Sequence, residues 1–187
     1  MGSEMCIRDR VELIRSRCNH LVVDDVDTDQ IIPARFLKTI GRAGLGAQLF
    51  ADWRGSRFDA AGDGRILLAG GNFGCGSSRE HAVWALADFG FEAVVARSFA
   101  DIFRANALKN GLVPVAVPDD AHRFLVAHAD AEILVDVARA QLLMPDGESV
   151  PFPLDEFARK CLTQGIDELE YLRQHETAIA VWEARHG

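Results

Sequence analysis

Short apolar runs alternate with amphipathic segments in the middle of the chain, and this alternation is its clearest pattern. Each apolar run has the length of a buried strand, and each amphipathic segment has apolar residues at helical spacing. Gly90 and Gly111 lie where two of the helices should end. The predicted strands are 66–69, 92–96 and 112–117. Because strands that alternate with helices pair in parallel through crossover connections, the region from 66 to 129 predicts a parallel sheet.

The segment before this region has a weaker pattern. Residues 13–23 predict one strand, although polar residues interrupt it, and an acidic turn follows at 24–29. Pro33 suits the first turn of a helix and predicts a short one at 34–38. The glycine-containing stretch at 41–46 predicts a loop.

The segment after residue 129 combines short strands with helices. The strands are separated by short turns, which favours antiparallel pairing. The predicted strands are 132–138, 141–144 and 149–152, and the predicted helices are 154–164 and 167–185. We therefore expect one α/β domain over 11–187, with a parallel βαβ core, extra antiparallel strands and a C-terminal helical extension from about residue 153. Residues 1–10 lack any such pattern and read as a non-native or disordered tail.

The composition narrows the class of protein. A net charge of −8 over 187 residues disfavours a nucleic-acid partner, because phosphate binding needs clustered Lys and Arg. No apolar run approaches the roughly 18 residues that span a bilayer, and no secretory signal is visible. The cysteines are widely spaced without a CxxC pair, which argues against a metal or iron–sulfur site built from this chain alone. We expect a cytoplasmic protein with reduced thiols, and neither a nucleic acid nor a membrane as partner.

The segment 72–81, NFGCGSSREH, combines three features that suit an anionic ligand. Its glycines, Gly76 among them, let the backbone approach a ligand closely. It precedes a helix whose first N–H groups and positive dipole end attract an anion. Ser77 and Ser78 are placed as helix N-caps, and Arg79 can bind a carboxylate through two hydrogen bonds. An ordinary strand–helix junction also contains glycines and capping serines, so these residues alone leave open that the serines are only caps.

Two other interpretations fit this segment less well. A serine hydrolase needs a G-x-S-x-G elbow, and the sequence GCGSS does not supply one. A dinucleotide site needs GxGxxG and an acidic residue that ends a second strand about 20 positions later, and the sequence provides neither.

Four segments, in order and at matching spacing, resemble the family of isopropylmalate dehydratase small subunits. They are DVDTDQIIPARFL (25–37), FADWR (50–54), FGCGSSREHAVWAL (73–86) and VVARSFADIFRANALKNGLVPV (94–115). The resemblance covers residues 21–183 and implies an aconitase-type swivelling β/β/α domain.

The same resemblance implies a hydro-lyase activity that this chain shares with a large subunit. Ser77 is then the base that removes a carbon-bound proton, Arg79 binds a substrate carboxylate, and Ser78 adds a hydrogen bond beside Gly76. A 4Fe-4S cluster is expected on the large subunit, and no cofactor is expected on this chain. The implied reaction converts 2-isopropylmalate to 3-isopropylmalate by loss and re-addition of water, in leucine biosynthesis.

The resemblance also implies roles for two further groups of residues. The supporting residues are Asp27, Thr28 and Asp29, and the specificity-loop residues are Phe36, Leu37 and Lys38. The first group matches a turn near the mouth of the active site, but a purely structural Asx turn is an alternative. In the second group, Phe36 and Leu37 are the expected apolar contacts for an isopropyl group, and packing against the core is the alternative. Cys75 is given no catalytic role, and His81 is expected to pack or hydrogen-bond, with a role as a base as the alternative.

Three rival hypotheses stay open at this point. A sister dehydratase subunit would act on another 2-hydroxy diacid, such as homoaconitate, methylmalate or dimethylmalate. A non-catalytic anion-binding module would keep the fold without needing Ser77 for turnover. A self-sufficient hydrolase would be active without any partner.

Overall fold

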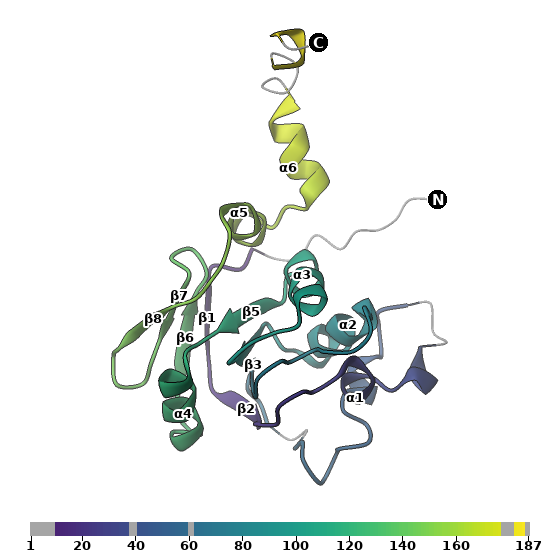
Figure 1. Ribbon diagram of the computed structural model, residues 1–187, viewed down its shortest axis with the longest axis vertical. Coiled ribbons are helices and arrows are strands. Elements are labelled where there is room, and N and C mark those ends of the chain that lie inside the picture. Colours follow the sequence, from purple (N-terminus) through teal and green to yellow (C-terminus); the bar gives the residue numbers. More distant parts are fainter. Residues whose placement is uncertain (1–9, 38–40, 60–61, 177–181, 186–187) are drawn as a thin grey trace.

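The computed structural model describes residues 10–37, 41–59, 62–176 and 182–185. Two four-stranded sheets are packed together, and a group of helices covers the outer face of one of them (Figure 1). The parallel sheet has the order β2-β3-β4-β5. Its strands are β2 (Cys18–Leu21), β3 (Ile66–Ala69), β4 (Ala93–Ala96) and β5 (Val113–Ala116). The parallel pairing predicted from the alternating pattern is confirmed.

The second sheet is antiparallel and has the order β1-β6-β7-β8. Its strands are β1 (Leu13–Ser16), β6 (Ile133–Asp136), β7 (Gln141–Leu143) and β8 (Ser149–Pro151). The three strands predicted after residue 129 are therefore confirmed. The fourth strand comes from the beginning of the chain, and pairs Leu13 with Asp136 and Ser16 with Ile133.

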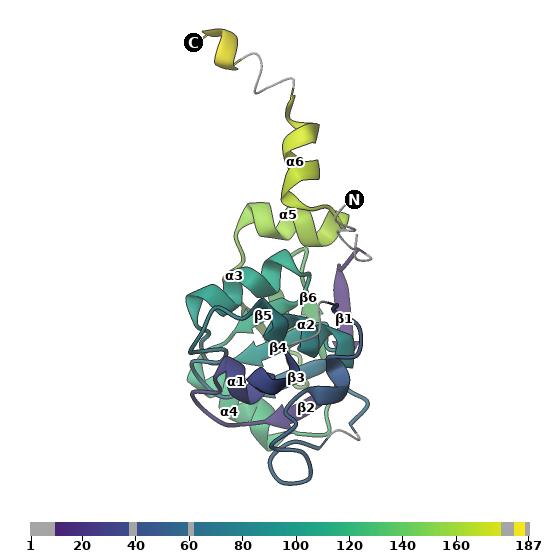
Figure 2. The same cartoon turned by 90° about the vertical axis from the view of Figure 1, so that its right-hand side faces the viewer.

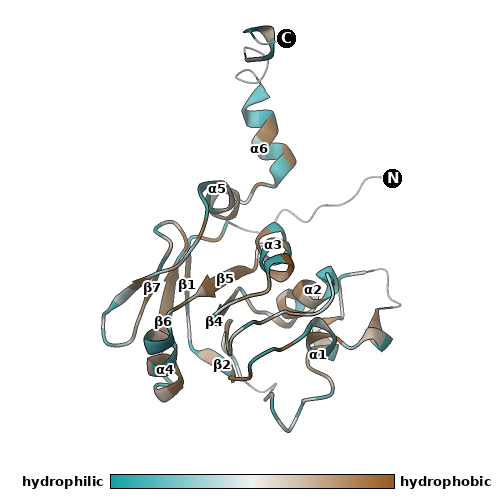
Figure 3. Ribbon diagram, viewed as in Figure 1, coloured by the Kyte–Doolittle hydropathy of each residue, from teal (hydrophilic) through white to brown (hydrophobic). Residues whose placement is uncertain are grey.

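Both faces of the parallel sheet are covered, so its central strands are apolar at every position. All residues of β3 and β4 are buried. Leu67 and Ala69 belong to a core that the helices complete, whereas Ile66 and Leu68 belong to a core shared with the antiparallel sheet. Figure 3 shows hydrophobic residues concentrated on these inner elements. The sheet thus separates two hydrophobic cores.

The helices occupy three places around the sheets. The helix-side core is covered by α1 (Thr28–Ile31), α2 (Glu80–Phe89) and α3 (Asp101–Lys109), with 3-10 turns η1 (Ala34–Phe36) and η2 (Gly46–Gln48) beside them. Ala121 and Leu125 of α4 (Asp119–Ala127) pack into the core between the sheets. After the last strand come α5 (Glu156–Gln164) and α6 (Glu168–Gln174), and α6 projects away from the body of the molecule (Figure 2).

The described part of the chain contains no helix that is long and apolar enough to cross a membrane. The predicted N-terminal tail lies outside the described residues, apart from Arg10.

Three predictions for the N-terminal region are wrong. Residues 13–23 form two strands in different sheets, because the chain passes from one sheet to the other at Arg17. Residues 24–29 are not a turn throughout: Asp27 is the N-cap of α1, and Thr28 and Asp29 lie in the first turn of that helix. The predicted helix at 34–38 is reduced to the 3-10 turn η1.

Candidate active site

The acidic turn after β2 and the glycine turn after β3 lie side by side at the carboxyl end of the parallel sheet. The N–H of Gly74 donates to the carbonyl of Val26 (2.8 Å), and the N–H of Thr28 donates to the carbonyl of Cys75 (3.0 Å). Loops that follow neighbouring parallel strands meet at the same sheet edge, where α/β proteins usually bind ligands. Two motifs that are distant in sequence thus form one site.

Phe73 and Gly74 fix the glycine turn against α3. The ring of Phe73 is fully buried and meets the ring of Phe103 edge-on, with 5.2 Å between centroids. Gly74 has a φ of +78°, and it lies so close to Phe103 that a Cβ would overlap with the aromatic ring. Glycine meets both requirements, whereas every other residue carries a Cβ that would overlap with the ring and adopts this φ only at a cost. The chain therefore leaves β3 in a fixed direction before it reaches Ser77.

Helix α2 begins at Glu80, later than the sequence predicted. Its N-cap is Arg79, which makes no side-chain capping bond. The prediction that Ser77 and Ser78 cap this helix is therefore wrong: Gly76, with a φ of +87°, turns the chain ahead of the helix and leaves both serines exposed. Their hydroxyls accept no hydrogen bond from the first N–H groups of the helix. The alternative that the two serines serve only as helix caps is therefore also wrong.

A contact between two hydroxyl groups joins the acidic turn to Ser77. Thr28 is buried, and its Oγ1 lies 3.1 Å from the backbone oxygen of Ser77 and 3.1 Å from the Oγ of Ser77. When Thr28 donates to the carbonyl, its own oxygen can accept the proton of the Ser77 hydroxyl. This arrangement orients the Ser77 hydroxyl from one side and leaves its other side open.

An ion pair joins the same turn to Arg79. The Nη1 of Arg79 donates to the Oδ1 of Asp29, and the side chains are 22% and 53% exposed. The hydrogen bond from Arg79 lowers the pKa of the Asp29 carboxyl below its usual value of 3.8. A guanidinium has five N–H donors, so Arg79 can bind a second carboxylate while it keeps Asp29.

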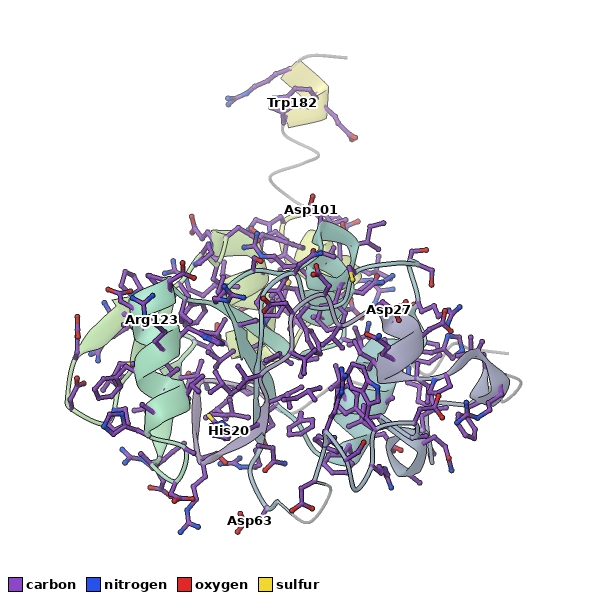
Figure 4. All side chains as sticks on the ribbon, turned by 60° about the horizontal axis from the view of Figure 1, so that its bottom comes forward. His20, Asp27, Asp63, Asp101, Arg123 and Trp182 are labelled. Carbon is purple, nitrogen blue, oxygen red and sulfur yellow. The ribbon has the colours of Figure 1, made fainter. Side chains whose placement is uncertain are left out.

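Asp27 has a structural part in this site. Its carboxylate accepts the N–H of Gln30 at 2.8 Å, and the side chain of Gln30 accepts the N–H of Asp27 at 2.9 Å. This reciprocal capping box begins α1 and keeps Thr28 and Asp29 in its first turn. Figure 4 shows Asp27 at the beginning of this helix.

The predicted specificity loop lies directly after α1. Phe36 and Leu37 are half-buried and pack against the helix-side core. Arg35 lies over the ring of Phe36 at 4.7 Å and forms an ion pair with Asp52. The contact of Phe36 and Leu37 with an isopropyl group stays a prediction, and Lys38 lies outside the described residues.

Cys75 and His81, which belong to the segment 72–81, have surroundings that do not favour a catalytic role. Burial, followed by the negative charges of Asp27 and Asp25, raises the pKa of the Cys75 thiol, so a reactive thiolate is disfavoured. The ring of His81 lies against the ring of Trp84, with 4.6 Å between centroids.

Sequence reasoning missed a polar cluster at the same end of the sheet. Asn72 donates through its side chain to Asp25 (2.8 Å) and through its N–H to the Oγ of Ser98 (2.8 Å), while Arg97 pairs with Asp24. These residues line a cavity of about 350 Å³. The sequence feature that could have revealed them is their position, because each lies within four residues after a strand of the parallel sheet. Their contacts tie the three neighbouring loops together.

Within the described ranges, no three His, Cys, Asp or Glu side chains lie close enough together to hold a metal ion. Cys18, Cys75 and Cys161 lie on β2, in the glycine turn and on α5. This part of the chain therefore offers no set of ligands for an iron–sulfur cluster.

Comparison with known proteins places these features in context. Residues 9–120 match the family of aconitase C-terminal domains. The 3-isopropylmalate dehydratase small subunit of Solibacter usitatus is 50% identical and covers 91% of this chain and 92% of its own length. The small subunit of Anaeromyxobacter dehalogenans is also 50% identical, and the match covers 92% of this chain and 96% of that protein. The crystal structure of a 3-isopropylmalate dehydratase from Methanocaldococcus jannaschii has a TM-score of 0.67 at 29% identity, covering 94% of this chain and 99% of its own.

Proposed function

Since the chain belongs to the family of 3-isopropylmalate dehydratase small subunits, we propose that Ser77 is its catalytic base and that Arg79 binds a substrate carboxylate. The chain is a subunit of a hydro-lyase of leucine biosynthesis and works with a large subunit. In this proposal its substrates are 2-isopropylmalate and 3-isopropylmalate, and it acts in the cytoplasm, where reducing conditions preserve thiols and iron–sulfur clusters.

One observation carries the proposal. An exposed hydroxyl and a partly exposed guanidinium lie at the beginning of α2, and the same acidic turn contacts both of them. Thr28 meets Ser77 and Asp29 pairs with Arg79, so the turn sets the position of both groups at once. A base and a carboxylate-binding group held together are what proton removal next to a carboxylate needs.

The reaction needs a base because the hydrogen that is removed is bound to carbon. Ser77, as its alkoxide, takes this proton and becomes a neutral hydroxyl, while the hydroxyl on the neighbouring carbon leaves with its bonding pair as hydroxide. The products are isopropylmaleate and hydroxide, which becomes water by taking up one proton from solvent. Water then adds back with the opposite regiochemistry and gives 3-isopropylmalate. A serine hydroxyl is a weak base, so its alkoxide must be stabilised. In this proposal the charge of Arg79 and the positive dipole end of α2, which begins at Glu80, provide this stabilisation.

The remaining residues of the site bind the substrate and orient it. Arg79 holds one substrate carboxylate, and Ser78 and the backbone at Gly76 contribute further polar contacts. A 4Fe-4S cluster of the large subunit, when bound, supplies Lewis-acid chemistry at the departing hydroxyl. Phe36 and Leu37 contact the isopropyl group in this proposal, and an apolar contact of this kind separates substrates only modestly.

The test of the catalytic assignment is Ser77→Ala, with Ser78→Ala as the matched control. Both serines are exposed and neither caps α2, so both variants should fold and assemble. Measured with the large subunit and its cluster, Ser77→Ala should lose turnover by about a thousandfold, which is typical for a general base. Ser78→Ala should lose much less. Unchanged turnover in Ser77→Ala would rule out Ser77 as the base.

The substrate assignment has a separate test. The reconstituted pair is assayed with 2-isopropylmalate and then with homoaconitate, methylmalate and dimethylmalate. We expect the largest kcat/KM for 2-isopropylmalate. A larger value for another diacid would assign the chain to a sister dehydratase and leave the role of Ser77 intact.

A further inference from the structure

A mainly apolar groove lies between the end of α3 and the two C-terminal helices. Its volume is about 640 Å³. We call it the C-terminal groove, and its apolar lining includes Leu108, Phe157, Leu162, Ile166, Leu169 and Leu172. A space of this size is sufficient for several apolar side chains of another protein.

Part of the groove wall is unusually open to solvent. Leu169 and Leu172 are three positions apart on α6 and therefore share a face, and they are 50% and 48% exposed. Phe157 of α5 also lines the groove and is 39% exposed. Figure 3 shows hydrophobic and hydrophilic residues on the same projecting helix. Large apolar side chains gathered in this way usually mark an interaction surface.

Helix α6 has little support from the other elements that the structure describes. It has seven residues, and an isolated helix of this length is marginal in water. One contact at its base is the edge-on packing of Tyr171 against Phe157, with 4.8 Å between ring centroids. A partner that covers Leu169 and Leu172 would supply the missing packing.

The position of the groove indicates which partner this is. Glu80 lines the groove, and its neighbour Arg79 belongs to the candidate active site. The wall of the groove therefore reaches the beginning of α2, next in the chain to the partly exposed Arg79. A protein that covers Ser77 and Arg79 with its own half of the active site also reaches the groove.

We propose that the C-terminal groove and the exposed face of α6 bind an apolar segment of the large subunit. This inference rests on the proposed function, since it takes the active-site face as the face that meets that subunit. The charged lining is mostly acidic: Glu80, Asp155, Asp167 and Glu168 outnumber Arg42 and Lys109. The segment that binds should accordingly carry basic residues beside its apolar ones.

The test uses the double variant Leu169→Ser/Leu172→Ser and the large subunit from the same organism. Increasing amounts of the small subunit are added to a fixed amount of cluster-loaded large subunit, which gives an assembly Kd and a plateau kcat. Sedimentation measures the same Kd without using activity. We expect the Kd to rise at least about tenfold, because apolar anchors at interface centres dominate binding. The plateau kcat should not change, since Ser77 and Arg79 are untouched.

Leu143→Ser is the matched control. Leu143 lies on β7, is 36% exposed and does not line the groove, so its replacement should leave the Kd unchanged. A thermal melt of each variant checks folding, and the single variant Leu172→Ser replaces the double variant if that one melts early.

The possible outcomes separate this inference from the catalytic one. An unchanged Kd in the double variant overturns the docking surface. The docking surface is also overturned if the double variant loses self-association of the small subunit while its Kd for the large subunit is unchanged. The groove would then join two copies of this chain. A Ser77→Ala complex that keeps its turnover contradicts the base assignment, but its Kd still measures docking.

Discussion

The hydroxyl of Thr28 is the side-chain group through which the acidic turn contacts Ser77. Thr28→Val keeps the volume of the side chain and removes its hydroxyl, so Ser77 loses this hydrogen-bond partner. We expect kcat of the reconstituted enzyme to fall about tenfold to a hundredfold, with little change in KM, because the base is misoriented. The measurement is a full kcat and KM determination with 2-isopropylmalate.

Thr28→Ser is the control for this prediction, since it restores a hydroxyl at the same position. It should recover most of the lost kcat. If the valine and serine variants behave alike, Thr28 acts through packing and does not position Ser77.

Asp29 makes acid stability and substrate binding depend on the same ion pair. Its pKa is lowered in the folded state, chiefly by the hydrogen bond from Arg79, so the folded protein binds this proton less readily than the unfolded chain. The pair therefore stabilises the fold above the usual pKa of 3.8, and this stabilisation is lost as the pH falls through the lower folded value. The carboxylate is half exposed, so the contribution is small.

Asp29→Asn should remove that part of the acid dependence, as urea unfolding at a series of acidic pH values would reveal. At neutral pH the variant should raise KM by about tenfold, because Arg79 loses the group that holds it in place. An unchanged KM would mean that Arg79 is oriented by other contacts.

At the scale of elements, the glycine turn depends on one glycine that is closely packed. Gly74→Ala puts a Cβ into the ring of Phe103 and forces an unfavourable φ, whereas Gly147→Ala has a similar positive φ of +89° and no neighbour within 4 Å. We expect Gly147→Ala to lower the free energy of unfolding by about 1 kcal/mol and Gly74→Ala by about 2–4 kcal/mol. Urea unfolding of both variants measures the difference. Equal losses would show that Phe103 moves aside at little cost.

Elements that depend on local pattern were predictable from the sequence. The strand at 66–69 has the predicted bounds, and Gly90 ends α2 as expected. The prediction was wrong where tertiary contacts decide. Ser77 and Ser78 look like N-caps, but Gly76 turns the chain before the helix and Arg79 takes the cap position.

The candidate site could be predicted only in part, for the same reason. The sequence identified both motifs, because a hydroxyl, a guanidinium and glycines before a helix have a chemical meaning on their own. The pairing of Thr28 with Ser77 depends on which strands become neighbours, and no local pattern contains that information. The polar cluster around Asn72 was missed because its members follow three different strands.

At the scale of the whole molecule, the parallel sheet joins two cores into one unit. Leu67 faces the helix-side core and Leu68 faces the antiparallel sheet, and both are fully buried. We expect Leu67→Ala and Leu68→Ala each to lower the free energy of unfolding by about 2–5 kcal/mol. The exposed control, Leu143→Ala, should change it by less than about 1 kcal/mol.

Both core variants should still unfold in one transition. The fluorescence of Trp53 and Trp84, which pack against the helix-side core, should follow the same curve as far-UV circular dichroism of the whole chain. Separate curves in Leu68→Ala would show that the antiparallel sheet unfolds independently.

The exposure of Ser77 and Arg79 on an open face also bears on gene dosage. If these two residues are half of a reaction centre, as proposed, the chain does no chemistry until its counterpart arrives, so surplus copies add nothing to metabolic output. We expect flux to follow whichever of the two gene products is scarcer. Balanced synthesis of the pair, rather than high expression of either one, then sets how fast the cell can make leucine.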